Sequence, residues 1–145
     1  RDSGLTLLNA TYGEFLNTNG IQPELGDQQL DGNYLTNAPK VSINLGLNYT
    51  SAISSGGSLT YRANAAYKSR IYFSEFNEYS QDAYTILDLN LIWESADETM
   101  RSRFFVKNAT DEDYIAGYLS SATGGGRFGQ WGYPRTVGIE IQRNF

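Results

Sequence analysis

Six segments of this 145-residue chain alternate apolar and polar side chains with a period of two. In the clearest of them, KVSINLGLNYT, the apolar residues Val41, Ile43 and Leu45 are separated by serine and asparagine. Residues two apart lie on the same face of a β-strand, whereas an α-helix repeats every 3.6 residues. The pattern therefore predicts an all-β chain whose strands each have one apolar face and one polar face.

The alternation places the six expected strands at residues 5–15, 40–50, 58–69, 84–94, 100–107 and 136–145. The first strand is the least regular, because it carries leucine on both faces. In that strand we expect Leu8, Ala10 and Tyr12 to lie on one face, with Leu5 and Leu7 on the other. The other five strands separate apolar from polar residues more cleanly.

The connections between these strands alternate strictly between long and short. The short ones are residues 51–57 and 95–99, and the long ones are residues 16–38, 70–83 and 108–131. Barrels of the bacterial outer membrane are built in this way, with short periplasmic turns and long extracellular loops. We therefore expect an antiparallel sheet of a transmembrane β-barrel, with the short turns at its periplasmic end.

The composition argues against several other classes of protein. A net charge of −5 argues against nucleic acid as a partner, because binding to phosphates needs a basic surface. The mean hydropathy of −0.44 argues against a membrane-spanning helix, although a barrel strand with one wet face also averages to a polar value. The chain has no histidine and no cysteine, so we expect no enzyme activity, no catalytic residue, no cofactor and no metal site. The acidic stretches DEDY and SEFNE lack the spacing of a calcium loop.

Aromatic residues of the apolar parity gather near the short-turn ends of the strands. They are Tyr49, Tyr61, Trp93 and Phe145. Aromatic rings form such girdles at the level of the lipid headgroups. We therefore expect these residues to contact the periplasmic edge of the membrane, and Tyr12 and Tyr67 to contact the opposite edge.

The polar parity carries charges of both signs on neighbouring strands. These residues are Asp88, Glu94, Arg101, Arg103, Lys107 and Glu140. Opposite charges on adjacent strands attract each other when they share a face. We expect them to form a ladder along an aqueous lumen, although the solvated outer face of a soluble sheet explains the charges equally well.

Two of the long connections are rich in aromatic residues and are candidates for contact with a substrate. The candidate residues are Tyr72, Phe73, Phe76, Tyr79, Tyr118, Arg127, Phe128 and Trp131. Aromatic rings stack on sugar rings and aromatic chelators, and a guanidinium group pairs with anionic groups. The alternative is that these rings pack the loops against each other or continue strands beyond the membrane.

Five stretches of the chain stand out as motifs: LTNAPKVSINLGLNY, RIYFSEFNEYSQDAYTILDLNLIW, RFFVKNATDEDY, GQWGYPRTVGI and the terminal RNF. Together they resemble the C-terminal part of TonB-dependent outer-membrane receptors. In that family an N-x-P motif precedes a barrel strand, KN-x-x-D-x-x-Y closes another, and Pro-Arg-x-x-Gly opens the last. Two positions depart from the family pattern. Ala109 stands where leucine is common, and Arg143 stands where an apolar or aromatic residue is usual.

The resemblance implies that residues 1–145 form the last part of a barrel of about 22 strands, closed around a plug domain that is not in this chain. It implies a place in the bacterial outer membrane and active uptake of a siderophore, cobalamin or an oligosaccharide. The implied partners are lipid, the plug and the rest of the barrel, TonB through a part N-terminal to this chain, and the outer-membrane assembly machinery. That machinery would read Phe145 as its signal, while this segment closes the barrel and supplies part of the extracellular vestibule.

Two other interpretations stay open at this point. The chain could be a complete small barrel of eight short strands, acting as an adhesin or surface protein, if the long connections hold two further strands. It could also be a soluble β-sandwich that binds carbohydrate or protein, if a second sheet covers residues such as Leu45, Leu89 and Ile139. The number of strands in the sheet and the surroundings of its apolar face separate these interpretations.

Overall fold

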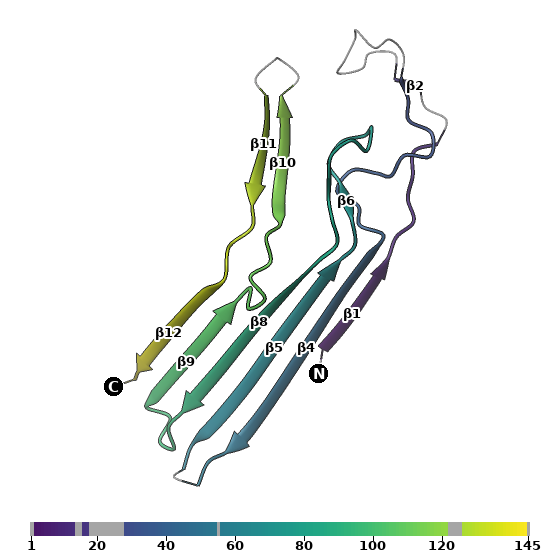
Figure 1. Cartoon of the computed structure of the whole chain (residues 1–145). Helices are drawn as coiled ribbons and strands as arrows, with labels where there is room; N and C mark the ends of the chain where they lie inside the picture. The colour runs from purple at the N-terminus through teal and green to yellow at the C-terminus, as the bar shows by residue number, and fades with distance from the viewer. Residues whose placement is uncertain (1, 14–15, 18–27, 55, 122–125, 145) are drawn as a thin grey trace.

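A six-stranded antiparallel sheet forms the body of the computed structural model, which describes residues 2–13, 16–17, 28–54, 56–121 and 126–144 (Figure 1). Its strands are β1 (Asp2–Leu7), β4 (Val41–Ala52), β5 (Ser58–Lys68), β8 (Tyr84–Glu94), β9 (Met100–Lys107) and β12 (Thr136–Arg143). Their spatial order is β1-β4-β5-β8-β9-β12, so each strand pairs with its predecessor among these six. The prediction of an all-β antiparallel sheet is confirmed. No helix among the described residues is long and apolar enough to cross a membrane.

Among the described residues, six shorter strands lie in the long connections and form separate two-stranded ribbons. The ribbons are β2 (Leu16–Asn17) with β3 (Gln28–Gln29), β6 (Ile71–Tyr72) with β7 (Ser80–Gln81), and β10 (Ile115–Ser121) with β11 (Gly126–Trp131). None of them joins the main sheet. The long connections therefore do contain strands, but these strands do not extend the sheet as the interpretation of a small complete barrel requires.

The two short connections lie together at one end of the sheet, and the three long ones lie at the other end (Figure 1). Gly57 brings the two short turns into contact. Its φ is +93°, and a Cβ atom there would collide with the carbonyl oxygen of Glu94. Two reasons therefore require glycine at this position: its positive φ and the close approach of the neighbouring turn.

The register of β1 corrects the prediction for the first strand. β1 ends at Leu7, and Leu5 and Leu7 pair with Ile43 and Val41, so these two leucines belong to the apolar face. Beyond β1 the Leu8 amide donates to the Lys40 carbonyl oxygen. Thr11 then forms an isolated antiparallel bridge with Tyr34, in the segment that precedes β4 and outside the main sheet. A strand over residues 5–15 was therefore wrong in its bounds. The cause is the presence of leucine at both parities, which leaves the alternation ambiguous until a neighbouring strand fixes the face.

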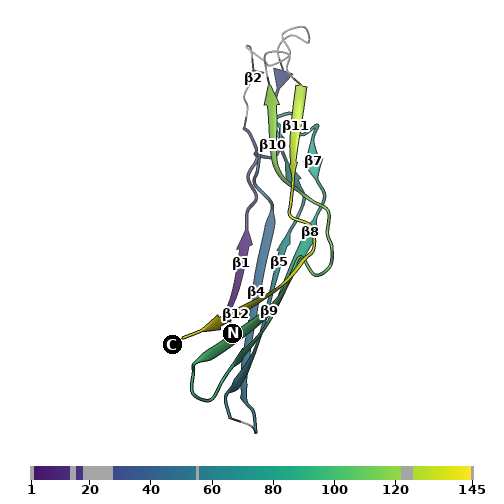
Figure 2. The same cartoon turned by 90° about the vertical axis from the view of Figure 1, so that its left-hand side faces the viewer.

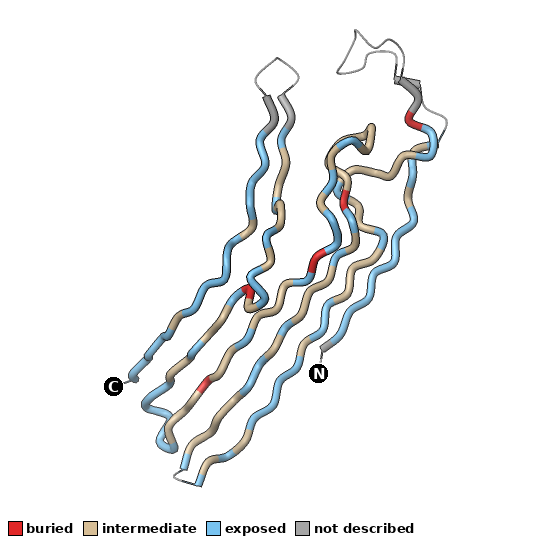
Figure 3. The backbone as a smooth tube through the Cα atoms, in the orientation of Figure 1, coloured by how far each residue is buried: buried red, intermediate tan, exposed pale blue. Residues whose placement is uncertain are grey.

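The main sheet is a single curved layer, as the view close to edge-on shows (Figure 2). Leu45, Leu89 and Ile139 on its apolar face are 53%, 39% and 66% exposed, and no second layer of described residues covers them. The few buried apolar residues lie elsewhere (Figure 3). Tyr84 and Ile92, for example, have the parity of the polar face, because they pair with Lys68 and Thr60. The apolar face is thus not the core of a soluble sandwich within the described residues.

Candidate functional site

The apolar face carries an aromatic band near the two short turns. Tyr49 and Tyr61 lie directly opposite each other on β4 and β5, with ring centroids 6.3 Å apart. Trp93 lies on the next strand, β8, where it pairs with Leu59. Phe145, the fourth residue predicted for this band, lies outside the described residues. The three described rings share one face and one end of the sheet, and their position at a membrane edge stays a prediction.

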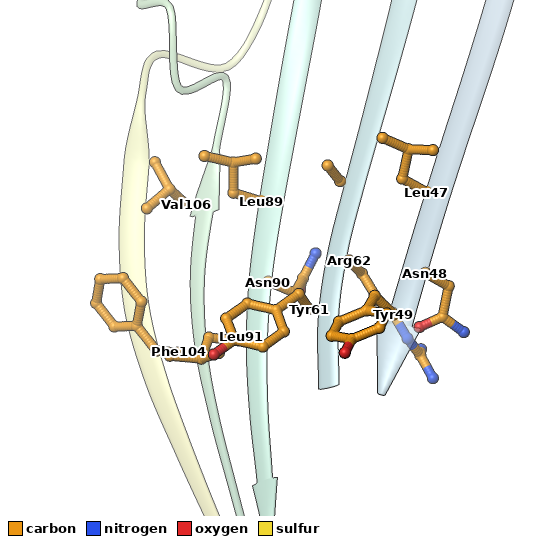
Figure 4. A pocket seen from close by; sticks show the side chains of 11 residues that line it. Leu47, Asn48, Tyr49, Tyr61, Arg62, Leu89, Asn90, Leu91, Phe104 and Val106 are labelled. Atoms are coloured by element: carbon orange, nitrogen blue, oxygen red, sulfur yellow. The ribbon is translucent and has the colours of Figure 1, made fainter. Parts of the chain in front are cut away.

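Next to this band the apolar face is hollowed into an open groove of about 680 Å³. Figure 4 shows the side chains of Leu47, Leu89 and Val106 along it, with the aromatic rings toward the short-turn end. The register places Ala63 directly between Leu47 and Leu89. The groove therefore arises because a small side chain lies between two large ones, and every strand around it contributes apolar side chains.

Polar side chains link three strands on the opposite face. The Arg103 guanidinium donates from Nε to Asn90 Oδ1 at 2.8 Å and from Nη1 to Glu140 Oε2 at 3.1 Å. Glu94 and Arg101 lie directly opposite each other on β8 and β9. The structure thus brings opposite charges together on adjacent strands. That this face lines an aqueous lumen stays a prediction.

One aromatic ring lies within this polar face and fits against a glycine. Phe105 on β9 pairs with Gly138 on β12, and a Cβ atom at Gly138 would collide with the Phe105 ring. The Arg103 guanidinium and the Lys107 ammonium lie over the same ring, 5.0 Å and 5.8 Å from its centroid. A cation over an aromatic face is attracted by the ring quadrupole. Gly138 therefore makes room for a ring that holds two cations in place.

Three of the predicted substrate residues stack on each other. Tyr118 of β10 lies between Phe73 and Tyr79, which flank the β6–β7 ribbon, with centroid distances of 5.4 Å and 5.5 Å. The Tyr118 hydroxyl is buried and has no hydrogen-bond partner among the described residues. These rings pack two long loops against each other. This is the arrangement that the sequence suggested as an alternative to contact with a substrate. Buried hydroxyl groups normally have a partner, so this one is left incomplete by the described residues.

The remaining candidates lie apart from this stack. Phe76 is half-buried in the loop between β6 and β7, whereas Phe128 and Trp131 on β11 are exposed. Phe128 pairs with Leu119, which is exposed as well. The Arg127 side chain lies outside the described part of the structure. The seven of these residues whose side chains are described do not converge on one pocket, and contact with a substrate stays a prediction for all eight.

The first and second long loops are tied together by asparagine side chains and stacked tyrosines. Asn77 Oδ1 accepts the Tyr34 backbone N–H at 2.7 Å, and Asn77 Nδ2 donates to the Tyr34 carbonyl oxygen at 3.0 Å. Asn33 Nδ2 donates to the Glu75 carbonyl oxygen at 3.0 Å. The Tyr34 ring also stacks on Tyr72, with centroids 5.5 Å apart. Tyr72, a predicted substrate residue, therefore packs against a loop that precedes β4.

A buried asparagine holds the start of the third long loop. Asn108 is 3% exposed, and its Nδ2 donates to the carbonyl oxygens of Glu112 and Tyr133 at 2.9 Å and 3.1 Å. Its Oδ1 accepts the Glu112 N–H at 2.9 Å, and its own N–H donates to Asp88 Oδ1 at 2.9 Å. The φ of Asn108 is +48°, a conformation that asparagine tolerates better than most residues. This residue therefore connects both ends of the loop to β8.

An ion pair and two stacked rings complete this connection. Asp111 Oδ2 accepts from Arg135 Nη2 at 3.0 Å, and Asp111 Oδ1 accepts the Arg135 backbone N–H at 3.1 Å. The Tyr114 ring stacks on Tyr84 at 4.7 Å and covers Gly132, where a Cβ atom would collide with it. We call Asn108, Asp111, Tyr114 and Arg135 the loop lock. It joins the two ends of the segment that carries the β10–β11 ribbon, after the chain leaves β9 and before it enters β12.

Sequence reasoning did not assign these residues a role, although the signal was present. The spacing KN-x-x-D-x-x-Y contains Asn108, Asp111 and Tyr114, and Pro-Arg-x-x-Gly contains Arg135 and Gly138. The two motifs are separated by a long loop, so nothing in the sequence shows that they touch. The structure explains their spacing, because each motif supplies one side of the loop lock.

The acidic stretches of the loops do not form a cation site within the described residues. No group of three or more acidic side chains there is close enough together to hold a metal ion. Asp111 is paired with Arg135, and Glu75 contributes its backbone carbonyl oxygen to the tie between the first and second loops. The chemistry of the described loops is therefore that of packing, hydrogen bonding and aromatic contact.

Known proteins resemble this chain both in sequence and in the structure of the sheet. A family profile described as TonB dependent receptor-like, beta-barrel matches residues 3–109. The ferric yersiniabactin uptake receptor FyuA from Yersinia pestis is 25% identical over 82% of this chain and 19% of that chain, with a TM-score of 0.69. BauA, the ferric preacinetobactin receptor from Acinetobacter baumannii, is 23% identical over 80% of this chain and 16% of that chain, with a TM-score of 0.62, and at that identity shows the fold alone. No curated protein sequence matches the chain.

This chain is much shorter than the two receptors. The chain spans less than a fifth of each of these two receptors. The family profile, in contrast, covers well over half of this chain, and the resemblance expected from the motifs is confirmed. The chain therefore belongs to the TonB-dependent receptor-like β-barrel family.

Proposed function

We propose that this chain is the C-terminal barrel segment of a TonB-dependent receptor in the bacterial outer membrane, which takes up a siderophore, cobalamin or an oligosaccharide. The family match over residues 3–109 is the observation that carries this proposal. The geometry supports it. The apolar face has no cover from the described residues, its aromatic rings gather at one end, and the long loops lie together at the other end. A single sheet of this kind suits a barrel wall between lipid and water.

A siderophore is the substrate class that we favour. FyuA and BauA are, by name, receptors for ferric yersiniabactin and ferric preacinetobactin. The exposed Phe128 and Trp131 on β11 offer aromatic surface at the loop end of the sheet. Such rings can stack on an aromatic chelator. Cobalamin and oligosaccharides remain the competing classes.

Each part of the chain has its own role in the proposed receptor. The free edges of β1 and β12 would pair with further strands, and β12 would close the barrel. The loops would form one sector of the extracellular vestibule, around a plug domain supplied by another part of the receptor. Phe145 would serve as the signal for the outer-membrane assembly machinery, and TonB would act through a part N-terminal to this chain. No catalytic step is assigned to the segment.

Uptake by the intact receptor tests this function. A strain that lacks the receptor gene is complemented with it, and uptake of a panel of radiolabelled ferric siderophores, cobalamin and oligosaccharides is measured. We expect uptake of at least one substrate, lost when TonB is deleted. Unchanged uptake without TonB, or no receptor-dependent uptake of any substrate, contradicts the proposal. Replacement of Phe128 and Trp131 by alanine, with the exposed Tyr133→Ala as control, then shows whether β11 contacts that substrate.

A further inference from the structure

A second pocket lies at the long-loop end of the sheet, away from the aromatic band. Its volume is about 400 Å³, and its lining includes Tyr34, Lys40, Tyr67, Ser69, Arg70 and Tyr72. Lys40 immediately precedes β4, and Arg70 follows the end of β5. The pocket therefore lies where these two strands begin and end, at the level where the long loops leave the sheet.

The pocket reaches the apolar face of the sheet through Tyr67. Tyr67 pairs with Ile43 on β4 and shares its face with Ala65, which pairs with Leu45. Beyond Tyr67 the ladder between β4 and β5 ends with the pair Ser42 and Lys68. Ser69 then closes it, because its N–H donates to the Val41 carbonyl oxygen at 3.0 Å and its Oγ accepts the Val41 N–H at 3.0 Å. The chain then leaves β5, and the loop residues Tyr34 and Tyr72 line the pocket together with Tyr67. The pocket thus continues the apolar face toward the loops.

The charged groups in this lining are cationic. They are the Lys40 ammonium and the Arg70 guanidinium, and no described carboxylate belongs to the lining. Lys40 Nζ donates to the Tyr34 hydroxyl at 2.6 Å, which uses one of its three N–H groups. Arg70 donates from Nε and Nη2 to a single oxygen of Asp82, at 3.0 Å and 2.7 Å. Both cations therefore retain hydrogen-bond donors for a further anion.

We propose that this pocket binds the phosphate-bearing headgroup of a lipid in the outer leaflet, whose acyl chains lie along the neighbouring apolar face. Phosphate oxygens accept charge-assisted hydrogen bonds from ammonium and guanidinium groups. Tyrosine rings such as Tyr67 are favoured at headgroup depth, where one end is apolar and the other is wet. A lipid suits the position better than a free anion, because Tyr67 joins the cationic site to the apolar face. The inference rests on the proposed place of the chain in the outer membrane, and the site is separate from substrate uptake.

Native mass spectrometry of the intact receptor in detergent tests the site. The probes are bisphosphorylated lipid A, its phosphate-free counterpart and inorganic phosphate. The variants are Lys40→Gln, Arg70→Gln and the double variant, and Lys40→Arg keeps the charge. Lys68→Gln is the matched control, because Lys68 neighbours Tyr67 in sequence but has the parity of the polar face. Each variant is first checked for the heat-sensitive gel mobility of a folded barrel.

We expect the affinity for lipid A to fall about tenfold in each single glutamine variant and about a hundredfold in the double variant, since each tenfold step corresponds to the loss of about one charge-assisted contact. Lys68→Gln and Lys40→Arg should leave the affinity unchanged. Equal binding of the phosphate-free lipid, or an equal loss in Lys68→Gln, overturns the proposal. Inorganic phosphate that binds as tightly as lipid A also overturns it, in favour of a simple anion site. If loss of the Asp82 contact unfolds the Arg70 variants, the Lys40 variants test the site on their own. Equal affinity of Lys40→Gln and Lys40→Arg for lipid A then overturns the proposal.

Discussion

Asn108 joins three segments of the chain through one amide side chain and its own backbone N–H. Replacement by alanine removes three side-chain hydrogen bonds and leaves the carbonyl oxygen of Tyr133, among others, without its partner. Each buried polar group left unsatisfied costs about 1 to 3 kcal/mol, and alanine tolerates the positive φ less well than asparagine does. We expect Asn108→Ala to destabilise the receptor by about 3 kcal/mol in urea unfolding in lipid vesicles, with faster amide exchange across residues 108–114. Asn48→Ala, at an exposed strand position, should change the free energy of unfolding by less than about 0.5 kcal/mol. A loss in Asn48→Ala as large as that in Asn108→Ala would show that the hydrogen bonds of Asn108 have no special role.

Gly138 is constrained by a neighbouring side chain. The Phe105 ring occupies the space of a Cβ atom there, so Gly138→Ala must displace the ring and with it the cations above it. Overpacking of this kind costs about 1 to 3 kcal/mol. Gly4 on β1 is the matched control, because nothing lies within 4 Å of a Cβ atom at that position. The same urea titration should show a loss for Gly138→Ala and no loss, or a small gain, for Gly4→Ala. A similar loss for both would mean that strand glycines matter here for another reason.

The turn between β8 and β9 is held by one carboxylate. Asp97 accepts hydrogen bonds from the Ser95 hydroxyl at 2.6 Å and from the Thr99 N–H and hydroxyl at 3.2 Å and 2.9 Å. The Ser95 bond first, and then the Thr99 bonds, lower the pKa of Asp97 below its ordinary value of 3.8. A lowered folded pKa means that the turn is stabilised above pH 3.8 and loses this stabilisation as the pH falls through the folded value.

Titration of the Thr99 amide proton checks this turn. By NMR of the receptor in detergent micelles, its chemical shift should titrate with a midpoint below 3.8, because the amide reports directly on the Asp97 carboxylate. Asp97→Asn removes the titrating group and should abolish this transition. A midpoint at or above 3.8 would show that the hydrogen bonds in the turn do not favour the charged carboxylate.

At the level of elements, the sequence predicts the strands well, because the alternation shows which side chains share a face of the sheet. Leu45 and Leu89 could be assigned to a face from their neighbours in the sequence alone. Leu5 and Leu7 could not, because β1 has leucine at both parities and only its pairing with β4 shows which face is apolar. The contacts between the loops are harder to predict from the sequence. The stack of Phe73, Tyr118 and Tyr79 joins residues from two separate loops, and no local pattern encodes that contact.

The same distinction applies to the candidate site. The aromatic band was predictable, because Tyr49 and Tyr61 follow from strand parity and distance to a short turn. The loop lock was not, because Asn108 and Arg135 meet only after the third long loop has folded back. Motif spacing marks such residues as unusual, but the partner of each one is a property of the tertiary structure.

For the whole molecule, the two faces of the sheet differ in polarity and therefore suit different surroundings. The polar face is tied across strands by groups such as Arg103 and Glu140, whereas the apolar face has no partner among the described residues. An uncovered apolar face of this extent is unusual for a soluble protein. In the proposed barrel, lipid covers the apolar face, and the polar face lines the lumen.

Two adjacent positions on β4 test which solvent each face meets. Leu45 lies near the middle of the strand on the apolar face, and Asn44 lies beside it on the polar face. An arginine in the lipid midplane destabilises an outer-membrane barrel by about 2 to 4 kcal/mol, whereas a lumen position tolerates it. We therefore expect Leu45→Arg to lower the free energy of unfolding in lipid vesicles by about that amount, and Asn44→Arg to change it little. If Asn44→Arg is the more damaging of the two, the polar face meets lipid or a packed layer, and the orientation of the sheet must be reversed.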